Sequence, residues 1–167
     1  MKGFYFTLLS LFLSFSMYAA TASAFTVPEC LDNEDTAIPV DNAKALNFKT
    51  TKPNQSLARA HVQGNIDTLY PNHSGHQHFS IRIGNEPNDK IEVVYSIDYG
   101  IIKNPEPGMS VEACGDLIVS NAAAGGYPAS PVGAIIHWIH RSDNDKHQSG
   151  FVMVNGTLYG QGEGTDD

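Results

Sequence analysis

A strict alternation of residue types between positions 60 and 70 is the pattern that most constrains the fold of this chain. One set of alternate positions is mainly apolar or small: Ala60, Val62, Gly64, Ile66, Thr68 and Tyr70. The positions between them are polar: His61, Gln63, Asn65 and Asp67. Successive side chains of a β-strand point to opposite faces, so this period of two predicts a half-buried strand. Gly64 in its middle would allow a sharp bend.

Further short segments of strand type follow, separated by turn-forming residues. We expect strands near 76–83, 91–97, 111–120 and 134–140. A terminal hairpin of 151–154 and 157–159 is expected around the Asn155-Gly156 turn. The sequence shows no long amphipathic helical pattern. Several short strands with regular turns are typical of a sandwich or barrel, so we expect an all-β domain over 57–160.

The segments that flank this domain have a different composition. Residues 25–56 contain Pro28, Pro39 and Pro53 and no sustained period, which predicts an irregular N-terminal arm. Residues 161–167 are Gly-rich and acidic, which predicts a disordered tail.

The first 24 residues are typical of a secretory signal peptide. Lys2 precedes an apolar run from Phe4 to about Tyr18, and Ala22 and Ala24 form a small-x-small pattern before the predicted cleavage point. The alternative is a membrane anchor, but the run is shorter than the roughly 20 residues that a spanning helix needs. We therefore expect export to the periplasm or the medium, without membrane insertion of the mature chain.

The charge of the predicted mature chain limits its partners. The sequence contains 10 Lys and Arg and 18 Asp and Glu, and cleavage removes only Lys2, which leaves 9 minus 18, or −9. Nucleic-acid affinity comes largely from Lys and Arg that neutralise phosphates, so this balance disfavours a nucleic-acid partner.

Cys30 and Cys114 are the two cysteines. An even count in an exported chain predicts one disulfide, which would tie the N-terminal arm to the barrel. The alternative is two free thiols.

Several motifs in the predicted domain resemble those of one family. They are His76-Gln77-His78-Phe79, Ile97-Asp98, Gly115-Asp116, the segment from Gly133 to His140 that contains His137-Trp138-Ile139-His140, then His147 and Gly150-Phe151. Together they resemble a family of short exported bacterial proteins known only as a domain of unknown function, over about Ala60 to Tyr159. The resemblance implies export and a small five-stranded barrel like the oligonucleotide/oligosaccharide-binding (OB) fold, here with the added C-terminal hairpin. It implies no reaction.

The sequence departs from the family pattern at several points. Tyr95-Ser96 stands where the family has His-Asn, Ile139 replaces a threonine, and Phe151 replaces a tryptophan. The loop at 121–131 is longer than usual. The missing histidine puts in doubt any role that requires it.

Histidines are the outstanding candidates for a site. Six of the seven fall into two groups: His73, His76 and His78, then His137, His140 and His147. Residues two apart on a strand share a face, so His76 and His78 could bind one metal with His137 or His140, in the manner of catalytic zinc. A straight strand points His137 and His140 to opposite faces, so only one of them would join unless a bulge intervenes. The simpler interpretation is a set of hydrogen-bonding surface histidines.

Other polar and aromatic side chains complete the candidate site. Gln77, Asp98 and Asp143 are its further polar members, and Asp145 is another possible base, although Asp143-Asn144-Asp145 is more typical of a plain turn. Candidates for stacking on a sugar or a base are Trp138, Tyr70, Tyr95 and Tyr127, although the default expectation for Trp138 is burial in the core. Asn54, Asn72 and Asn155 match the glycosylation pattern, which a bacterial origin would make irrelevant.

We favour an exported binding or interaction module with a His-rich polar face and an unidentified ligand. The alternative is a small metal-dependent hydrolase, such as a nuclease-like OB protein, with a divalent metal such as zinc at His76, His78 and His137. A third hypothesis is a pH-responsive secreted factor, because histidines change charge near neutral pH.

Overall fold

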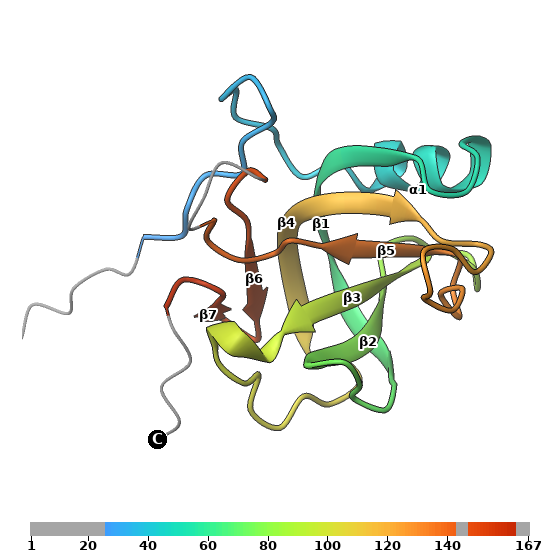
Figure 1. Cartoon of the computed structure of the whole chain (residues 1–167). Helices are drawn as coiled ribbons and strands as arrows, with labels where there is room; N and C mark the ends of the chain where they lie inside the picture. The colour runs from blue at the N-terminus through green and yellow to red at the C-terminus, as the bar shows by residue number, and fades with distance from the viewer. Residues whose placement is uncertain (1–25, 143–146, 163–167) are drawn as a thin grey trace, which may run out of the picture.

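The computed structural model describes residues 26–142 and 147–162 (Figure 1). The predicted signal peptide, Asp143 and Asp145, and residues 163–167 of the predicted tail lie outside these ranges. The described elements, in chain order, are α1 (Asn42–Thr51), β1 (Leu57–Leu69), β2 (His76–Arg82), β3 (Lys90–Ser96), the 3-10 turn η1 (Ile97–Tyr99), β4 (Ser110–Val119), β5 (Ala134–His137), β6 (Phe151–Val154) and β7 (Thr157–Tyr159).

Five of these strands close into a barrel, as predicted. Neighbouring strands follow the order β1-β2-β3-β5-β4, and a long antiparallel pairing of β1 with β4 completes the ring. The contact between β3 and β5 is parallel, and the other barrel pairings are antiparallel. The hairpin β6–β7 continues the sheet from β4 and turns at Asn155-Gly156. The all-β barrel and its C-terminal hairpin are therefore confirmed.

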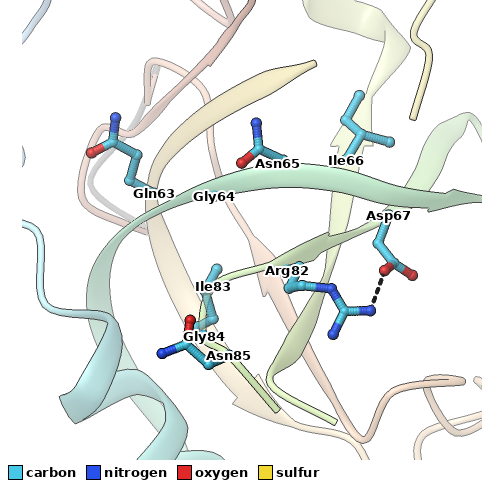
Figure 2. Close-up of a pocket in the computed structure, with 9 residues that line it drawn as sticks. All are labelled: Gln63, Gly64, Asn65, Ile66, Asp67, Arg82, Ile83, Gly84 and Asn85. Carbon is cyan, nitrogen blue, oxygen red and sulfur yellow. Dashed lines mark hydrogen bonds and ion pairs between the residues drawn. The ribbon is translucent and has the colours of Figure 1, made fainter. Parts of the chain in front are cut away.

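The alternation of β1 holds over its first part and then changes phase. Ala60, Val62 and Ile66 are buried, as predicted, but the pairing with β2 shifts between Ile66 and Thr68, and Thr68 is exposed. Gly64 lies where β1 passes close to the end of β2, because a Cβ there would be 2.1 Å from the carbonyl oxygen of Arg82. Figure 2 shows Gly64 on β1 next to Arg82 and Ile83. The bulge explains why Thr68 does not enter the core.

The barrel encloses one main hydrophobic core. The inward positions of its strands are filled by aliphatic and aromatic side chains, including Val62, Phe79, Ile81, Ile91, Val93, Tyr95, Val111, Leu117 and Ile136. On β2, β3 and β5 the positions between these, such as His78, Glu92 and His137, therefore face the outside of the barrel.

The N-terminal segment contains a helix that the sequence did not lead us to expect. Asp41 caps α1 by accepting a hydrogen bond from the backbone N–H of Lys44 at 2.9 Å. Ala45 is buried in the main core, and Leu46 and Phe48 pack against it. Figure 1 shows α1 beside the start of β1 and the end of β4. The prediction of an irregular arm was wrong for this stretch, because tertiary packing stabilises a helix with only a narrow apolar face.

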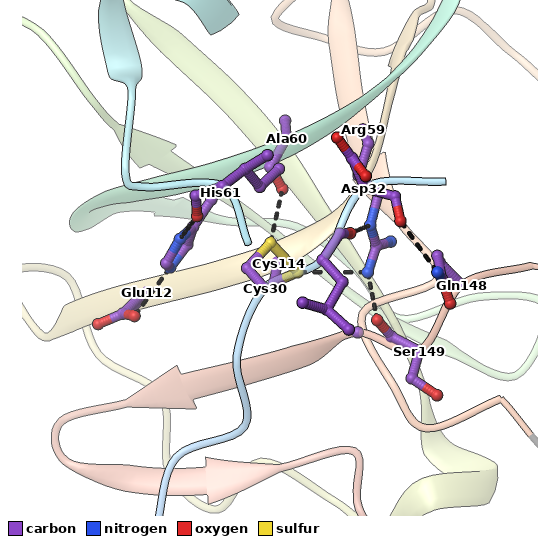
Figure 3. Close-up of a disulfide and its surroundings, with 12 residues drawn as sticks. Cys30, Asp32, Arg59, Ala60, His61, Glu112, Cys114, Gln148 and Ser149 are labelled. Atoms are coloured by element: carbon purple, nitrogen blue, oxygen red, sulfur yellow. Dashed lines mark hydrogen bonds and ion pairs between the residues drawn. A yellow bond between two sulfur atoms is a disulfide. The ribbon is translucent and has the colours of Figure 1, made fainter. Parts of the chain in front are cut away.

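The predicted disulfide is confirmed. Cys30 and Cys114 are bonded, with their Cα atoms 5.5 Å apart, and both are buried beside Phe151. The bond ties the N-terminal segment to β4, as Figure 3 shows. Within residues 26–142 and 147–162, none of the helices has the length and apolar character needed to cross a bilayer.

Candidate functional site

Six of the seven histidines lie in one group on the outside of the barrel. We call His73, His76, His78, His137, His140 and His147 the histidine cluster. Consecutive ring contacts connect all six: His76 and His137 join the two groups predicted from the sequence, and Trp138 connects His137 with His140 and His147. His61 lies apart from the cluster and binds the N-terminal segment through the carbonyl oxygen of Ile38.

The first half of the cluster comes from β2, the turn before it and the end of β5. The rings of His73 and His78 stack with centroids 3.9 Å apart, and those of His76 and His78 are 6.2 Å apart. The rings of His76 and His137 are 5.2 Å apart, and their Nε2 atoms are separated by 3.3 Å. Two imidazole nitrogens from distant parts of the chain thus face each other directly.

The second half surrounds Trp138. Its ring stacks on that of His147 at 4.7 Å and touches that of His137 at 4.4 Å. The rings of His140 and His147 meet edge to face at 4.9 Å, and His140 also stacks on Tyr99 at 3.8 Å. Tyr99 belongs to η1, so this turn closes one side of the cluster.

A left-handed backbone conformation at Trp138 brings both halves together. β5 ends at His137, and Trp138 has a φ of +55°, which is unusual for a bulky residue. Trp138 therefore points outward beside His137, with 37% of its surface exposed, while Ile139 enters the core. The expected strand to position 140 and the expected burial of Trp138 were both wrong, because a straight strand was assumed. A straight strand would point His137 and His140 to opposite faces. The positive φ of Trp138 lets both rings join the cluster.

Gly115 and Gly150 allow the backbone segments around Trp138 to pack closely. A Cβ at Gly150 would lie 2.3 Å from the carbonyl oxygen of Cys114 and 2.4 Å from that of Trp138. A Cβ at Gly115 would lie 2.4 Å from the carbonyl oxygen of His137. These distances are too short for a Cβ atom at either position. This accounts for the glycines of the motifs Gly115-Asp116 and Gly150-Phe151.

We expect Gly150→Ala to lower the free energy of unfolding by about 1–3 kcal/mol, because the added methyl group must displace backbone atoms. The matched control is Gly162→Ala, where nothing lies within 4 Å of the added Cβ. Urea unfolding of both variants measures the difference. Equal midpoints for the two variants would show that the close approach is not required.

Backbone and carboxylate partners set the orientation of several rings. The Nδ1 atoms of His76, His140 and His147 lie 2.8–2.9 Å from the carbonyl oxygens of Ser74, Arg141 and Gln148 respectively. A carbonyl oxygen only accepts hydrogen bonds, so each Nδ1 carries the proton. In a neutral ring, Nε2 then keeps its lone pair.

The carboxylate of Glu92 orients the His78 ring, as the carbonyl oxygens orient the other three. Its Nδ1 lies 2.8 Å from Oε1 of Glu92, and both side chains are only 7% exposed. Its Nε2 is buried and has no hydrogen-bond partner among residues 26–142 and 147–162, and the same is true of the neighbouring Ser80 hydroxyl. Buried polar atoms of this kind are rare in folded proteins and call for an explanation by water, an ion or a ligand.

Burial and the other histidines keep His137 neutral. Burial comes first, followed by the charges of His76, His140, His147 and His78, and together they lower the pKa of His137 to about 4. The unfolded value is near 6.5. A folded pKa below the unfolded one means that the unfolded chain binds more protons, so stability is full above about pH 6.5 and falls towards pH 4.

For the metal-free protein we expect this one group to remove about 2 kcal/mol of stability between pH 7 and pH 5. Replacing His137 with Gln should remove that part of the pH dependence. Urea unfolding midpoints of both proteins at the two pH values measure it. A wild-type midpoint that is equal or higher at pH 5 would contradict the clustered arrangement.

Some predicted members lie away from the cluster. Gln77 points inward and exchanges two hydrogen bonds with the backbone of Ile102, since strand alternation separates it from His76 and His78. Tyr95 is fully buried, donates to the carbonyl oxygen of Tyr99 at 2.7 Å, and has its pKa raised to about 12 by burial. It is a core residue and not a stacking surface.

The remaining candidates are peripheral. Asp98 is exposed in η1, and within residues 26–142 and 147–162 no contact joins its carboxylate to the histidines. Tyr127 is 68% exposed, and Tyr70 is partly buried. Asn54 holds the backbone of Ala122. Glu92, Ser80 and Tyr99 belong to the site but were missed, although the alternation of β3 places Glu92 outward and could have revealed it.

No ready-made metal site is present among the described residues, since no three His, Cys, Asp or Glu side chains are positioned to hold an ion. His76 and His137 form a pair, and the position of His78 is considered further below.

A separate shallow pocket of about 360 Å³ lies between β1 and the end of β2 (Figure 2). Its charged members Asp67 and Arg82 are paired at 2.5 Å, and Asp67 is also paired with Lys90 at 2.6 Å. Lys90 first of all lowers the pKa of Asp67 to about 2. Its charges already have partners and it contains no histidine, so we regard it as a weaker candidate than the histidine cluster.

The fold and the site define a disulfide-bonded all-β barrel with a histidine cluster on its outer surface. No family model, no curated protein and no solved structure matches the chain. The resemblance to the exported family therefore stays a prediction.

Proposed function

We propose that this protein is an exported binding module of the OB type and that the histidine cluster is its ligand-binding surface. Its five-stranded barrel with the order β1-β2-β3-β5-β4 supports the OB assignment. The signal-peptide pattern of residues 1–24 and the Cys30–Cys114 disulfide support export.

The convergence of six histidines on one surface carries the proposal. Three features of this arrangement oppose stability: among the described residues His78 Nε2 has no hydrogen-bond partner, Trp138 has a positive φ, and titratable rings lie against one another. Local departures from good packing and polar satisfaction concentrate at functional sites. Ligand binding gives a reason for all three departures.

The position of the cluster agrees with how OB barrels bind. In that fold, ligands lie on the face of strands 2 and 3 and on the adjoining loops. Here His76 and His78 lie on β2, Glu92 lies on β3, and His73 lies in the turn between β1 and β2. This support is an analogy of fold, and the chemistry of the side chains supplies the rest.

Trp138 provides a built-in reporter, because it is the single tryptophan of the chain and contacts His137 and His147. The test is a fluorescence titration of tag-free protein with zinc chloride, copper sulfate, inorganic phosphate, a neutral chitin hexasaccharide and an oligo-dT strand. We expect saturable binding of at least one probe at one equivalent, and none of oligo-dT because the predicted mature chain, without Lys2, carries 9 minus 18, or −9.

Two variants make the result specific. A double variant with His76→Gln and His137→Gln should lose the response, whereas Asn85→Ala in the separate pocket should keep it. Failure of every probe to bind, or binding that survives the double variant, would overturn the proposal.

A further inference from the structure

We infer that His76, His78 and His137 form a binding site for one late transition-metal ion, with zinc or copper(II) as the ligand class. This inference rests on the proposed function and names the ligand of the same surface. Three imidazole donors with no carboxylate favour such ions over magnesium and calcium, which prefer oxygen.

The pair His76–His137 already has the spacing of two ligands on one ion. For Zn–N bonds of about 2.0–2.1 Å at a tetrahedral angle, the two nitrogens lie about 3.3–3.4 Å apart and the ring centres about 5.2 Å apart. The observed values are 3.3 Å between the Nε2 atoms and 5.2 Å between the centroids. An ion between the two rings needs no large movement of either.

His78 supplies the third donor from the adjoining position. The register pairs His78 with Val94, and the pairing Val93↔Ile136, continued by one residue, puts Val94 beside His137. His78 and His137 therefore flank Val94 across three neighbouring strands. The centroids of His76 and His78 are 6.2 Å apart, about 1 Å more than the tetrahedral spacing. Binding by all three rings therefore requires the His78 ring to move towards the ion with its buried Nε2, for which the described part of the chain offers no hydrogen-bond partner.

The groups behind these rings match those found behind metal-bound histidines. Such histidines usually donate their second ring N–H to a carbonyl oxygen or a carboxylate, which fixes the ring and makes it a better donor. Here Ser74 O accepts from His76 and Glu92 accepts from His78. Both rings therefore present Nε2 to the site. Three protein ligands leave a fourth position open for water or a small ligand.

The test is isothermal titration calorimetry of tag-free, metal-stripped protein with zinc chloride and with copper sulfate. We expect one ion per chain with a micromolar or lower Kd. His76→Gln, His78→Gln and His137→Gln should each weaken binding by about 100-fold or more. Glu92→Gln should weaken it by about 10–100-fold, because it supports a ligand without touching the ion.

His61→Gln is the matched control, because it removes a histidine outside the cluster and should leave the Kd unchanged. Far-UV circular dichroism checks that each variant is folded. A Kd in the millimolar range, a stoichiometry above one, or equal weakening by His61→Gln and His76→Gln would overturn the metal assignment. If another probe binds at the cluster while both metals fail, the metal inference falls and the proposed function stands. If no probe binds, both fall.

Discussion

Replacing Cys30 and Cys114 together by alanine is expected to lower the free energy of unfolding by about 2–5 kcal/mol. The disulfide joins residues 84 positions apart, and a chain-entropy estimate for a loop of this length is about 4–5 kcal/mol. Alanine is the proper replacement because both sites are buried among apolar side chains, where serine would add an unsatisfied hydroxyl. Urea unfolding of the double variant against wild type measures the loss.

The same substitution should also disturb the histidine cluster. The segment after Cys30 holds the loop that carries His147, since Gln148 donates to Asp32 O at 2.9 Å and to Asp35 Oδ1 at 2.6 Å. Gln148→Ala is the control that removes these bonds but keeps the disulfide. We expect the double variant and Gln148→Ala to change the fluorescence of Trp138 similarly, with a large stability loss only in the former. Unchanged stability without the disulfide would contradict this account.

Arg59→Ala is expected to lower the free energy of unfolding by about 3–5 kcal/mol, because it leaves a largely buried carboxylate without its partner. The guanidinium donates to Asp116 at 3.3 Å and to Leu31 O at 2.8 Å. It also donates to Cys114 Sγ at 3.2 Å and to Ser149 O (Figure 3). Burial lowers the pKa of Arg59 and Asp116 opposes that effect, so the group stays charged in the fold.

Arg59→Lys keeps the charge but cannot reproduce the fork of donors, so its loss should fall between wild type and Arg59→Ala. The double variant Arg59→Ala with Asp116→Ala should recover part of the loss, since no buried charge is then left alone. Urea unfolding of wild type, Arg59→Ala, Asp116→Ala and the double variant completes the cycle. An Arg59→Ala loss below about 1 kcal/mol would show that the ion pair behaves as an exposed surface pair.

The strands were predictable because their side-chain pattern repeats at the period of the strand itself. Phe79 and Ile81 on β2 and Val152 and Val154 on β6 alternate with outward residues, and the Asn155-Gly156 turn marks the hairpin. The helix α1 was missed because it buries mainly Ala45, so its apolar pattern is weak. Its cap at Asp41 and its end before Pro53 were visible in the sequence and are ordinary helix signals.

The candidate site could be predicted only in part. The spacing of His76 and His78 placed them on one face, and the structure brings them to His137. The joining of His140 depends on the positive φ of Trp138, which no side-chain period reports. Gln77 lies inward, hydrogen-bonded to the backbone of Ile102, as its odd phase relative to His76 indicates.

The most direct test of the histidine cluster is a long-range ¹H–¹⁵N spectrum of its imidazole rings, recorded on metal-free protein and again with one equivalent of zinc. Without metal, the account predicts that His76, His140 and His147 carry their proton on Nδ1. With zinc, the Nε2 resonances of His76, His78 and His137 should shift, while His61 should stay unchanged. Protons on Nε2 in the metal-free rings, or a zinc response at His61 with none at His76 and His137, would contradict the account.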